Sequence, residues 1–584
     1  VHIDGAFLHK IYQTDIAKLL SMKSSLNKFG FMFLIVILFG QNPSPNRFAL
    51  NTTANSLSLS NGLSSNIVAE IRLMGDSLTW LGTGQGLALH DGRKVYTHQT
   101  TSDLLSDGDE TKLLPEGGIP AISVSGDTLA VSFSGDNGSI QVGYGLAITR
   151  NASSIQDSAG ISWTFLEQPM DSESDVVKPF GEGFFRILPV TVPEANVTYD
   201  SFIYDGYLWT ASWAGGLRRY NLRNPGWEIV PLPMDDQDSL STCSGFTQVD
   251  TLDNKPIKDD YYLNPRDPSD GGNHNHKAFS VLVYEDTVWV GTANGINRGS
   301  IIDTVIYPGG NQPPIFKNCI EWVHYSYPND GLSGNFVVGL ARQVWNGKST
   351  IWAATMNAES PGEVRGLSYT RDGGLSWQTT LLGERIYNIF SRDSLVLASS
   401  QSGLWKSYDG NNWALFDPAI DTTFLSQKQI LTNTVYTSLL DQRDVIQNIN
   451  KLWIGTPDGL AFTSDLHGES WNIFQTEYDS TEFYVYPNPF SPNNHNQLGN
   501  EGFVRFHTGT IATINPELAI FNFAMEKVYE KSYDLNNYNG ALKWDGRDMN
   551  GKIVDNGVYF IRIKYSQAVN KSPQDYWDKL IVVK

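Results

Sequence analysis

Two histidines that stand two residues apart are the clearest candidates for metal chemistry in this chain. Side chains at i and i+2 of a β-strand share a face, so His274 and His276 in the segment GGNHNHKAF could chelate a metal ion. Asp267 and Asp270 lie nearby in the sequence as candidate oxygen ligands. The segment is also polar enough to be an ordinary insertion loop, the interpretation we favour. We therefore expect no metal and no cofactor, and keep the two histidines as the only metal candidates.

Hydrolysis of a glycosidic bond would need another kind of site, two carboxylates about 5–10 Å apart. The chain has 62 Asp and Glu residues, too many for the sequence to select a pair, so we name no catalytic residue. The segment FRILP at residues 185–189 resembles the Phe/Tyr-Arg-Ile-Pro motif of sialidases, which implies a carboxylate-binding role for Arg186. The extra Leu188 departs from that motif. We therefore expect Arg186 to be an ordinary strand-edge residue.

The element that recurs along the chain is a short apolar strand ending in a Trp-x-Gly-Thr-like tetrad. Its clearest copy is WIGT at residues 453–456, and a Gly-Leu or Gly-Ile pair that opens another strand follows most copies. The tetrads begin at Trp80, Val131, Trp209, Trp289, Trp352, Val396 and Trp453. One such unit cannot bury both of its faces, so copies must stack on one another. Residues 60–478 are therefore predicted to form an all-β, seven-bladed β-propeller with about four antiparallel strands in each blade.

A second motif lies in the later repeats, where a turn combines a carboxylate, a glycine and a tryptophan. Its regular copy has Asp372, Gly374 and Trp377, and two copies of different length contain Asp409 with Trp413 and Asp465 with Trp471. The motif resembles the Asp-box, or BNR repeat, of sialidase-like and sortilin-like propellers. That resemblance implies structural turns in which the carboxylate accepts backbone N–H groups, not catalysis.

Related repeats point to a second family. Residues 60–68 and 329–337, together with the tetrads, resemble the propeller repeats of bacterial two-component sensor ectodomains. Nothing after residue 478 resembles the transmembrane helix and kinase of those sensors. The sensor role therefore does not carry over.

The N-terminal region has the layout of an export signal. Residues 1–21 are expected to be a non-native extension before Met22, and residues 22–41 place Lys23 and Lys28 before an apolar run of 11 residues, 29–39. That run is too short for a bilayer-spanning helix, which needs about 20 residues. We therefore expect a signal peptide, with residues 42–59 as a linker or closing strand and no membrane span in the mature protein.

The character of the sequence changes after residues 478–482, and residues 483–584 read as a small β-sandwich. Its motifs are YPNPF, WDGRDMNG, GVYFIRI and the terminal KLIVVK, with the marker residues Pro487, Asn488, Pro489, Phe490, Trp544, Asp545, Gly546, Gly557, Tyr559 and Lys579. They resemble the immunoglobulin-like domain of hook-capping type and the C-terminal sorting domain of type IX secretion substrates. The resemblance implies recognition by the outer-membrane secretion machinery of a Gram-negative bacterium, and delivery through the periplasm to the medium or the outer cell surface. A purely structural module is the alternative.

Composition narrows the remaining choices. The net charge of −20 argues against nucleic-acid binding, which needs a basic surface. Two cysteines, Cys243 and Cys319, cannot form a disulfide framework or a Cys-rich zinc site, but one bridge and two free thiols both stay open.

The function predicted from these features is a secreted or cell-surface, non-catalytic binding propeller for a polysaccharide or a protein. One alternative is an Asp-box-type glycoside hydrolase, sialidase-like or xyloglucanase-like, and another is a structural surface protein. Because the repeats share their structural residues, we expect the functional residues where the copies differ, above all in the insertion at residues 235–277.

Overall fold

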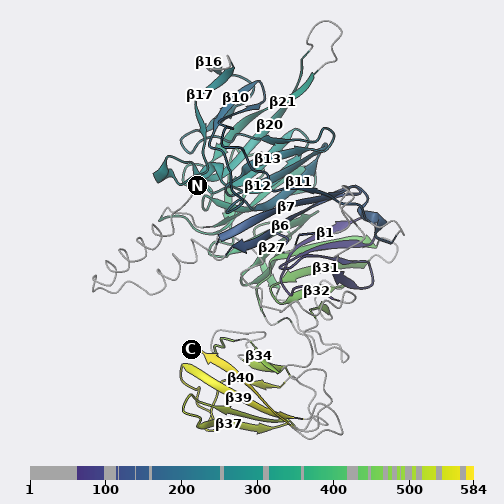
Figure 1. Ribbon diagram of the computed structural model, residues 1–584, viewed down its shortest axis with the longest axis vertical. Helices are drawn as coiled ribbons and strands as arrows, with labels where there is room; N and C mark the ends of the chain where they lie inside the picture. The colour runs from purple at the N-terminus through teal and green to yellow at the C-terminus, as the bar shows by residue number, and fades with distance from the viewer. Residues whose placement is uncertain are drawn as a thin grey trace, which may run out of the picture. The chain divides into compact units, whose positions relative to one another are not determined.

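The described part of the chain folds into β-sheets, as the computed structural model shows (Figure 1). The structure describes residues 62–97, 114–115, 117–137, 140–156, 161–249, 255–306, 315–356, 361–416, 430, 432–444, 449–464, 471–476, 483–486, 488–492, 503–507, 516–533, 542–565 and 574–584. Within these ranges the only helical elements are short 3-10 turns, so the all-β prediction is confirmed. The predicted signal peptide, linker and N-terminal extension lie outside these ranges.

No helix among the described residues has both the length and the apolar character that crossing a membrane requires.

The chain divides into two compact units, one containing Thr100–Tyr387 and the other containing Arg47–Gln99 and Asn388–Lys584. The first unit contains four sheets whose strand order follows the chain. They comprise β5 (Ile122–Ser125), β6 (Thr128–Asn137), β7 (Ile140–Thr149) and β8 (Thr164–Leu166); β11 (Thr198–Tyr204), β12 (Tyr207–Ser212), β13 (Gly216–Asn221) and β14 (Trp227–Ile229); β18 (Ala278–Tyr284), β19 (Thr287–Thr292), β20 (Gly295–Ile306) and β21 (Ile315–Tyr325), extended by β15 (Ser239–Ser241); and β22 (Phe336–Trp345), β23 (Lys348–Met356), β24 (Gly366–Thr370) and β25 (Gln378–Thr380).

A fifth sheet of this unit, which we call the accessory sheet, does not follow chain order. It contains β9 (Val177–Phe180), β10 (Gly183–Ile187), β16 (Phe246–Val249) and β17 (Pro256–Leu263), in the order β16-β17-β10-β9. Two 3-10 turns follow β17, η3 (Pro268–Asp270) and η4 (His274–His276). The insertion at residues 235–277 therefore contains the strands β15, β16 and β17, while its histidine segment lies in a turn, as expected.

The second unit contains three further sheets in chain order and two C-terminal sheets. The three are β1 (Val68–Met74), β2 (Leu78–Thr83), β3 (Leu87–His90) and β4 (Val95–Thr97); β26 (Ile386–Arg392), β27 (Leu395–Ser400), β28 (Gly403–Ser407) and β29 (Ala414–Phe416); and β30 (Thr437–Asp444), β31 (Ile449–Thr456), β32 (Gly459–Thr463) and β33 (Asn472–Phe474). The C-terminal sheets are β34 (Tyr484–Tyr486), β35 (Val504–His507) and β38 (Lys543–Trp544); and β36 (Glu517–Phe521), β37 (Lys527–Ser532), β39 (Gly557–Tyr565) and β40 (Gln574–Val582).

Each predicted tetrad lies on the second strand of its own chain-ordered sheet. These strands are β2, β6, β12, β19, β23, β27 and β31. The small tetrad residues are required by close packing: a Cβ added to Gly455 would lie 2.6 Å from the carbonyl oxygen of Val68. The tetrad tryptophan fills the space between sheets, since Trp453 is 1% exposed and packs with Leu81 and Ala88 of β2 and β3.

The first and last chain-ordered sheets are joined by Arg443 of β30. Its Nη1 donates to the carbonyl oxygens of Met74 and Leu78, over 3.0 and 2.6 Å, and its Nη2 donates to Thr79 Oγ1 over 2.9 Å. Asp441 holds the same guanidinium from the other side, over 2.8 Å. Figure 1 shows β1 beside β31 and β32, consistent with this join.

The C-terminal strands enclose a core of their own. Val485, Val504 and Trp544 of one sheet share a buried cluster with Ile520 and Ile561 of the other. Two segments that are far apart in the sequence meet here: Asn488 Oδ1 accepts from Ile581 N over 2.9 Å and its Nδ2 donates to Lys579 O over 2.5 Å. The YPNPF and KLIVVK segments are therefore joined by hydrogen bonds.

Candidate functional site

The accessory sheet is assembled from two insertions that lie on either side of the sheet β11–β14 in the chain. Strands β9 and β10 precede that sheet, whereas β16 and β17 belong to the insertion at residues 235–277. The two insertions meet in a parallel pairing of β10 with β17, in which Phe184 pairs with Ile257 and Ile187 pairs with Leu263. Both insertions are therefore needed to form this sheet.

Aromatic packing and one disulfide hold the accessory sheet in place. Phe185 of β10 is buried and contacts Phe246 and Tyr261 edge-on, with ring centroids 5.5 and 5.2 Å apart. Cys243, just after β15, forms a disulfide with Cys319 of β21 across a separation of 76 residues. The sequence alone allows either a bridge or two free thiols, and the structure contains the bridge.

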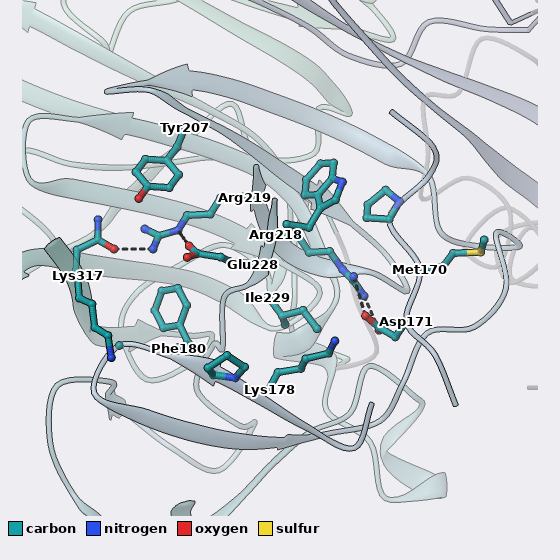
Figure 2. A pocket seen from close by; sticks show the side chains of 15 residues that line it. Met170, Asp171, Lys178, Phe180, Tyr207, Arg218, Arg219, Glu228, Ile229 and Lys317 are labelled. Atoms are coloured by element: carbon teal, nitrogen blue, oxygen red, sulfur yellow. Dashed lines mark hydrogen bonds and ion pairs between the residues drawn. The ribbon is translucent and has the colours of Figure 1, made fainter. Parts of the chain in front are cut away.

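A cavity of about 380 Å³ opens between strand β9 of the accessory sheet and strand β14 (Figure 2). Each of these strands is the outermost strand of its sheet. The walls come from residues 169–171, residues 178–181, strands β12–β14 and residues 317–318 of β21. We call this cavity the β9/β14 pocket, and its volume lies within the range of small-molecule sites.

Arg219 of β13 is the centre of the pocket wall. Figure 2 shows its guanidinium between the rings of Tyr207 and Phe180, which lie 4.4 and 5.0 Å from the guanidinium carbon. Nε donates to Glu228 over 2.5 Å, and Nη2 donates to Asn318 over 2.6 Å. The third nitrogen, Nη1, is buried without a hydrogen-bond partner. A buried charged donor that lacks a partner is costly and therefore calls for an explanation.

A second arginine of the pocket is fully paired. Arg218 binds Asp171 through two parallel hydrogen bonds of 3.0 and 2.7 Å, and the two side chains are 5% and 3% exposed. This fork-to-fork geometry fixes the loop that carries Asp171 against β13. The pair therefore serves to shape the wall.

The pocket is more basic than the rest of this acidic chain. Its lining contains four cationic side chains, Lys178, Arg218, Arg219 and Lys317, against two carboxylates, Asp171 and Glu228. Lys178 also pairs with Asp175 outside the lining, over 2.9 Å. Lys317 is exposed and has no ion pair among the described residues. Burial raises the pKa of Tyr207, so this phenol stays neutral and can donate a hydrogen bond.

No protein-family model matches the chain, and no curated protein matches it.

Several solved structures are similar at low sequence identity. The extracellular domain of the hybrid two-component system BT3049 from B. thetaiotaomicron is 12% identical, with 88% of this chain and 72% of that chain covered and a TM-score of 0.25. An ancestral GH74 enzyme is 14% identical, with 89% and 63% covered and a TM-score of 0.41. PorZ, a surface component of the type-IX secretion system of Porphyromonas gingivalis, is 12% identical, with 91% and 88% covered and a TM-score of 0.20. At TM-scores below 0.5, these similarities assign neither a family nor a function.

The predicted metal candidates do not form a metal site in this structure. His274 and His276 lie in the 3-10 turn η4, not in a strand, so they do not share a strand face. Both ring nitrogens of His276 are used: Nδ1 accepts from Asn264 N over 2.9 Å and Nε2 lies 3.0 Å from the carbonyl oxygen of Leu232. Among the described residues no group of three His, Cys, Asp or Glu side chains could hold a metal ion.

The predicted oxygen ligands near this pair have other partners. Asp267 caps η3, accepting from Ser269 N over 3.0 Å, and Asp270 lies within that turn. The backbone N–H of His274 donates to Asp235 over 2.8 Å, which fixes the start of η4. Burial lowers the pKa of His276 to about 4, although the nearby Asp235 opposes that shift. His276 is therefore a neutral structural residue at neutral pH.

Arg186 is not the strand-edge residue that we expected. It lies in β10, which has β9 on one side and β17 on the other, and it pairs with Val177 and Tyr262. Nothing in the local sequence indicates that this strand has a parallel partner, β17. Arg186 is not among the residues that line the β9/β14 pocket.

The carboxylates of the two described Asp-box-like turns bind backbone and side-chain donors. Asp372 Oδ1 accepts from Ser376 N over 2.9 Å, and Gly374 takes the left-handed φ of +98° that the turn requires. Asp409 accepts from Asn411 N and Asn412 N, each over 2.8 Å. These hydrogen bonds lower the pKa of Asp372 to about 2, the bond from the Ser376 hydroxyl being the largest cause, and they also lower the pKa of Asp409.

The tryptophans of these motifs differ in burial. Trp377 and Trp471 are buried, whereas Trp413 is half-buried and donates from Nε1 to Gly410 O over 3.3 Å. Asp465 lies outside the described residues.

The marker residues of the C-terminal region lie in its core and turns. Phe490 and Trp544 are buried, and Trp544 Nε1 donates to Arg547 O over 2.7 Å. Tyr559 donates from its hydroxyl to Asp555 O over 2.8 Å. In the turns, Asp545 accepts from Arg547 N, Gly546 has a φ of +77°, and Pro489 follows a cis peptide bond. In the strands, Gly557 begins β39 and Lys579 lies in β40. Pro487 lies outside the described residues.

Sequence reasoning missed the two pocket arginines, although a signal was present. In the seven Gly-Leu or Gly-Ile pairs, the next residue is small in four copies, Ala88, Ala147, Ser368 and Ala461. In the β13 copy the same position is Arg218, followed by Arg219. The small residues of those four copies are all buried, so an arginine pair at this position of β13 indicates a local change of chemistry.

Proposed function

We propose that this protein is an exported, non-catalytic binding protein whose ligand occupies the β9/β14 pocket. The observation that carries the proposal is the origin of the pocket: one wall comes from β9 of the accessory sheet, which is not part of any of the seven chain-ordered sheets, and it faces strands β12–β14 of the third of these sheets. The tetrads and glycines that all the repeats share have a packing role, so they do not distinguish one repeat from another.

The architecture proposed for this function is a seven-bladed β-propeller. Its support is the set of seven chain-ordered sheets, each with its tetrad on the second strand, and the hydrogen bonds of Arg443 that join the first of these sheets to the last. A ring of blades needs such a closing contact, because otherwise two sheet faces would remain open to water. In this proposal the turns at Asp372 and Asp409 are Asp-boxes with a structural role.

Binding is favoured over hydrolysis because of the state of the pocket carboxylates. Asp171 and Glu228 are each bound to an arginine, at 2.7 and 2.5 Å. A glycosidase needs one carboxylate free to donate a proton and another free to attack or to activate water. Both carboxylates here are committed to shaping the wall.

The binding proposal is tested with the purified full chain on arrays of saccharides and bacterial surface proteins. We expect specific retention of one class, and we expect the pocket variant Trp227→Ala to lose it. Trp345→Ala is the matched control, because Trp345 is an exposed tryptophan on β22 outside the pocket. Failure of the full chain to bind on either array, or equal retention of Trp227→Ala, would refute the proposal.

We further propose that residues 483–584 form an immunoglobulin-like sorting module that directs the protein to the outer cell surface or the medium. The support is the hydrogen bonding of Asn488 in YPNPF to the backbone of the terminal strand β40, which makes the motif segments one structural unit. Deleting residues 483–584 should leave the protein in the periplasm, as cell fractionation and surface proteolysis would report. Unchanged surface delivery would show that the sorting signal lies in another part of the chain.

A further inference from the structure

The β9/β14 pocket contains one unsatisfied hydrogen-bond donor and one positive charge without an ion pair. Nη1 of Arg219 is buried without a partner, and Lys317 carries an exposed ammonium group without an ion pair among the described residues. The charges of the arginines and of Lys178 are balanced, because Arg219 pairs with Glu228, Arg218 with Asp171, and Lys178 with Asp175. In a chain with a net charge of −20, a lysine without an ion pair and an arginine with an unsatisfied nitrogen in one pocket lining are a distinctive local feature.

We infer that the pocket binds a saccharide through a single carboxylate, that is, a uronic-acid unit of an acidic glycan. This inference rests on the proposed binding function and names the ligand class of the same site. A carboxylate oxygen is the acceptor that Nη1 lacks, and a guanidinium hydrogen bond to a carboxylate is about twice as strong as a neutral one. The negative charge of the ligand would also be attracted to Lys317.

The walls suit a sugar ring. Tyr207 of β12 and Trp227 of the edge strand β14 both line the pocket and are half-buried, so each presents both apolar area and a polar group. Asn318 and the neutral hydroxyl of Tyr207 can exchange hydrogen bonds with sugar hydroxyls. The volume of about 380 Å³ accommodates a compact ligand and no long chain.

The geometry disfavours an extended peptide. Peptides commonly bind open sheet edges as an added strand, and both β9 and β14 are outermost strands. However, these two strands approach within 8 Å between Cα atoms. A strand inserted between them would need about 9.6 Å, twice the usual interstrand spacing. Pro179 in β9 also lacks the N–H donor that strand addition uses.

The test measures binding of the full chain to a galacturonate trisaccharide and to its methyl ester by calorimetry. The ester has the same rings but no charge. We expect the acid to bind. The ester should bind more weakly by a factor of roughly ten or more, because it lacks one charge-assisted contact. Affinity for the acid should also fall as salt increases.

Two variants locate the charge. Lys317→Glu should weaken binding of the acid roughly tenfold, while Lys348→Glu, the same charge change on an exposed lysine of β23, should leave it unchanged. Both side chains are exposed, so neither variant should unfold the protein. Arg219→Lys keeps the charge but removes Nη1, and it should weaken the acid more than the ester.

The inference is overturned if the ester binds as well as the acid, if Lys317→Glu and Lys348→Glu behave alike, or if neither trisaccharide binds. It is also overturned if a peptide with a free terminal carboxylate binds in place of the trisaccharide. In each of these cases the array result with Trp227→Ala still decides the proposed binding function separately, because that comparison assumes no ligand charge.

Discussion

Arg443 Nη1 and the carbonyl oxygen of Leu78 lie 2.6 Å apart, although 365 positions separate the two residues in the chain. The same side chain also donates to the carbonyl oxygen of Met74 and the hydroxyl of Thr79, so one arginine forms hydrogen bonds on both sides of the β1–β2 turn. Its own charge is balanced by Asp441, whose side chain is 7% exposed. The last chain-ordered sheet is thereby joined to the first by hydrogen bonds from an arginine whose charge is balanced within its own strand.

Replacing Arg443 should therefore destabilise the protein strongly. Arg443→Ala leaves Asp441 buried without its counter-charge and removes the donors to β1 and β2, and we expect a loss of about 3 kcal/mol in the free energy of unfolding. Chemical denaturation followed by tryptophan fluorescence measures this loss. Arg223→Ala is the control, because the Arg223–Asp205 pair is exposed and its loss should cost little. Equal effects of the two substitutions would contradict the closing role of Arg443.

The Cys243–Cys319 disulfide should matter for both stability and binding. Substituting both cysteines by serine opens a loop of 76 residues and so gives the unfolded chain more conformational freedom. The chain-entropy treatment predicts that this lowers the free energy of unfolding by about 4 kcal/mol. Because Cys319 follows the pocket residues Lys317 and Asn318 directly, ligand affinity should fall as well. Thermal unfolding with and without a reductant is the measurement. If reduction leaves both the melting temperature and the affinity unchanged, the bridge does not support the pocket.

Stability should fall in mild acid because of His276. Its pKa is about 4 in the folded protein and about 6.5 when unfolded, so below pH 6.5 the unfolded chain binds the proton first. The free energy of unfolding should therefore decrease between pH 6.5 and 4, by roughly 3 kcal/mol from this group. In His276→Gln the stability at pH 7 should be lower, but this part of the pH dependence should disappear. An unchanged slope in the variant would show that other groups cause the acid sensitivity.

Asp372 should prove structural. Its folded pKa of about 2 lies below the ordinary value of 3.8, so the stability it contributes is present above pH 3.8 and is lost as the pH falls toward 2. Asp372→Ala should lower the melting temperature at pH 7 more than the exposed control Asp303→Ala, and it should leave ligand binding intact. Loss of ligand binding without loss of stability would instead assign Asp372 to a site.

The sequence predicted the repeating part of the fold well because that part depends on local chemistry. Tryptophan followed by small residues occupies the crowded second strand in most sheets, and Gly455 shows why a larger residue does not fit there. The accessory sheet could not be predicted in the same way. Strands β10 and β17 pair in parallel, although the whole sheet β11–β14 lies between them in the chain. Nothing in the local sequence of either strand indicates its partner.

The pocket could not be predicted from the sequence either, because its residues come together from separate strands. The spacing of His274 and His276 suits a strand, but the segment forms a 3-10 turn whose first backbone N–H donates to Asp235, and His276 is buried. Arg219 gained its role only through Glu228, Asn318 and two rings that come from separate strands.

The split origin of the accessory sheet constrains how such a pocket can arise. Neither insertion forms the wall alone, because β9–β10 without β17 would leave an unpaired edge at β10, and β16–β17 without β10 would leave one at β17. Such an edge favours aggregation, so an ancestor that acquired one insertion first would have been at a disadvantage. Relatives of this protein should therefore have both insertions or neither, and inheritance of the pocket should appear as a single step.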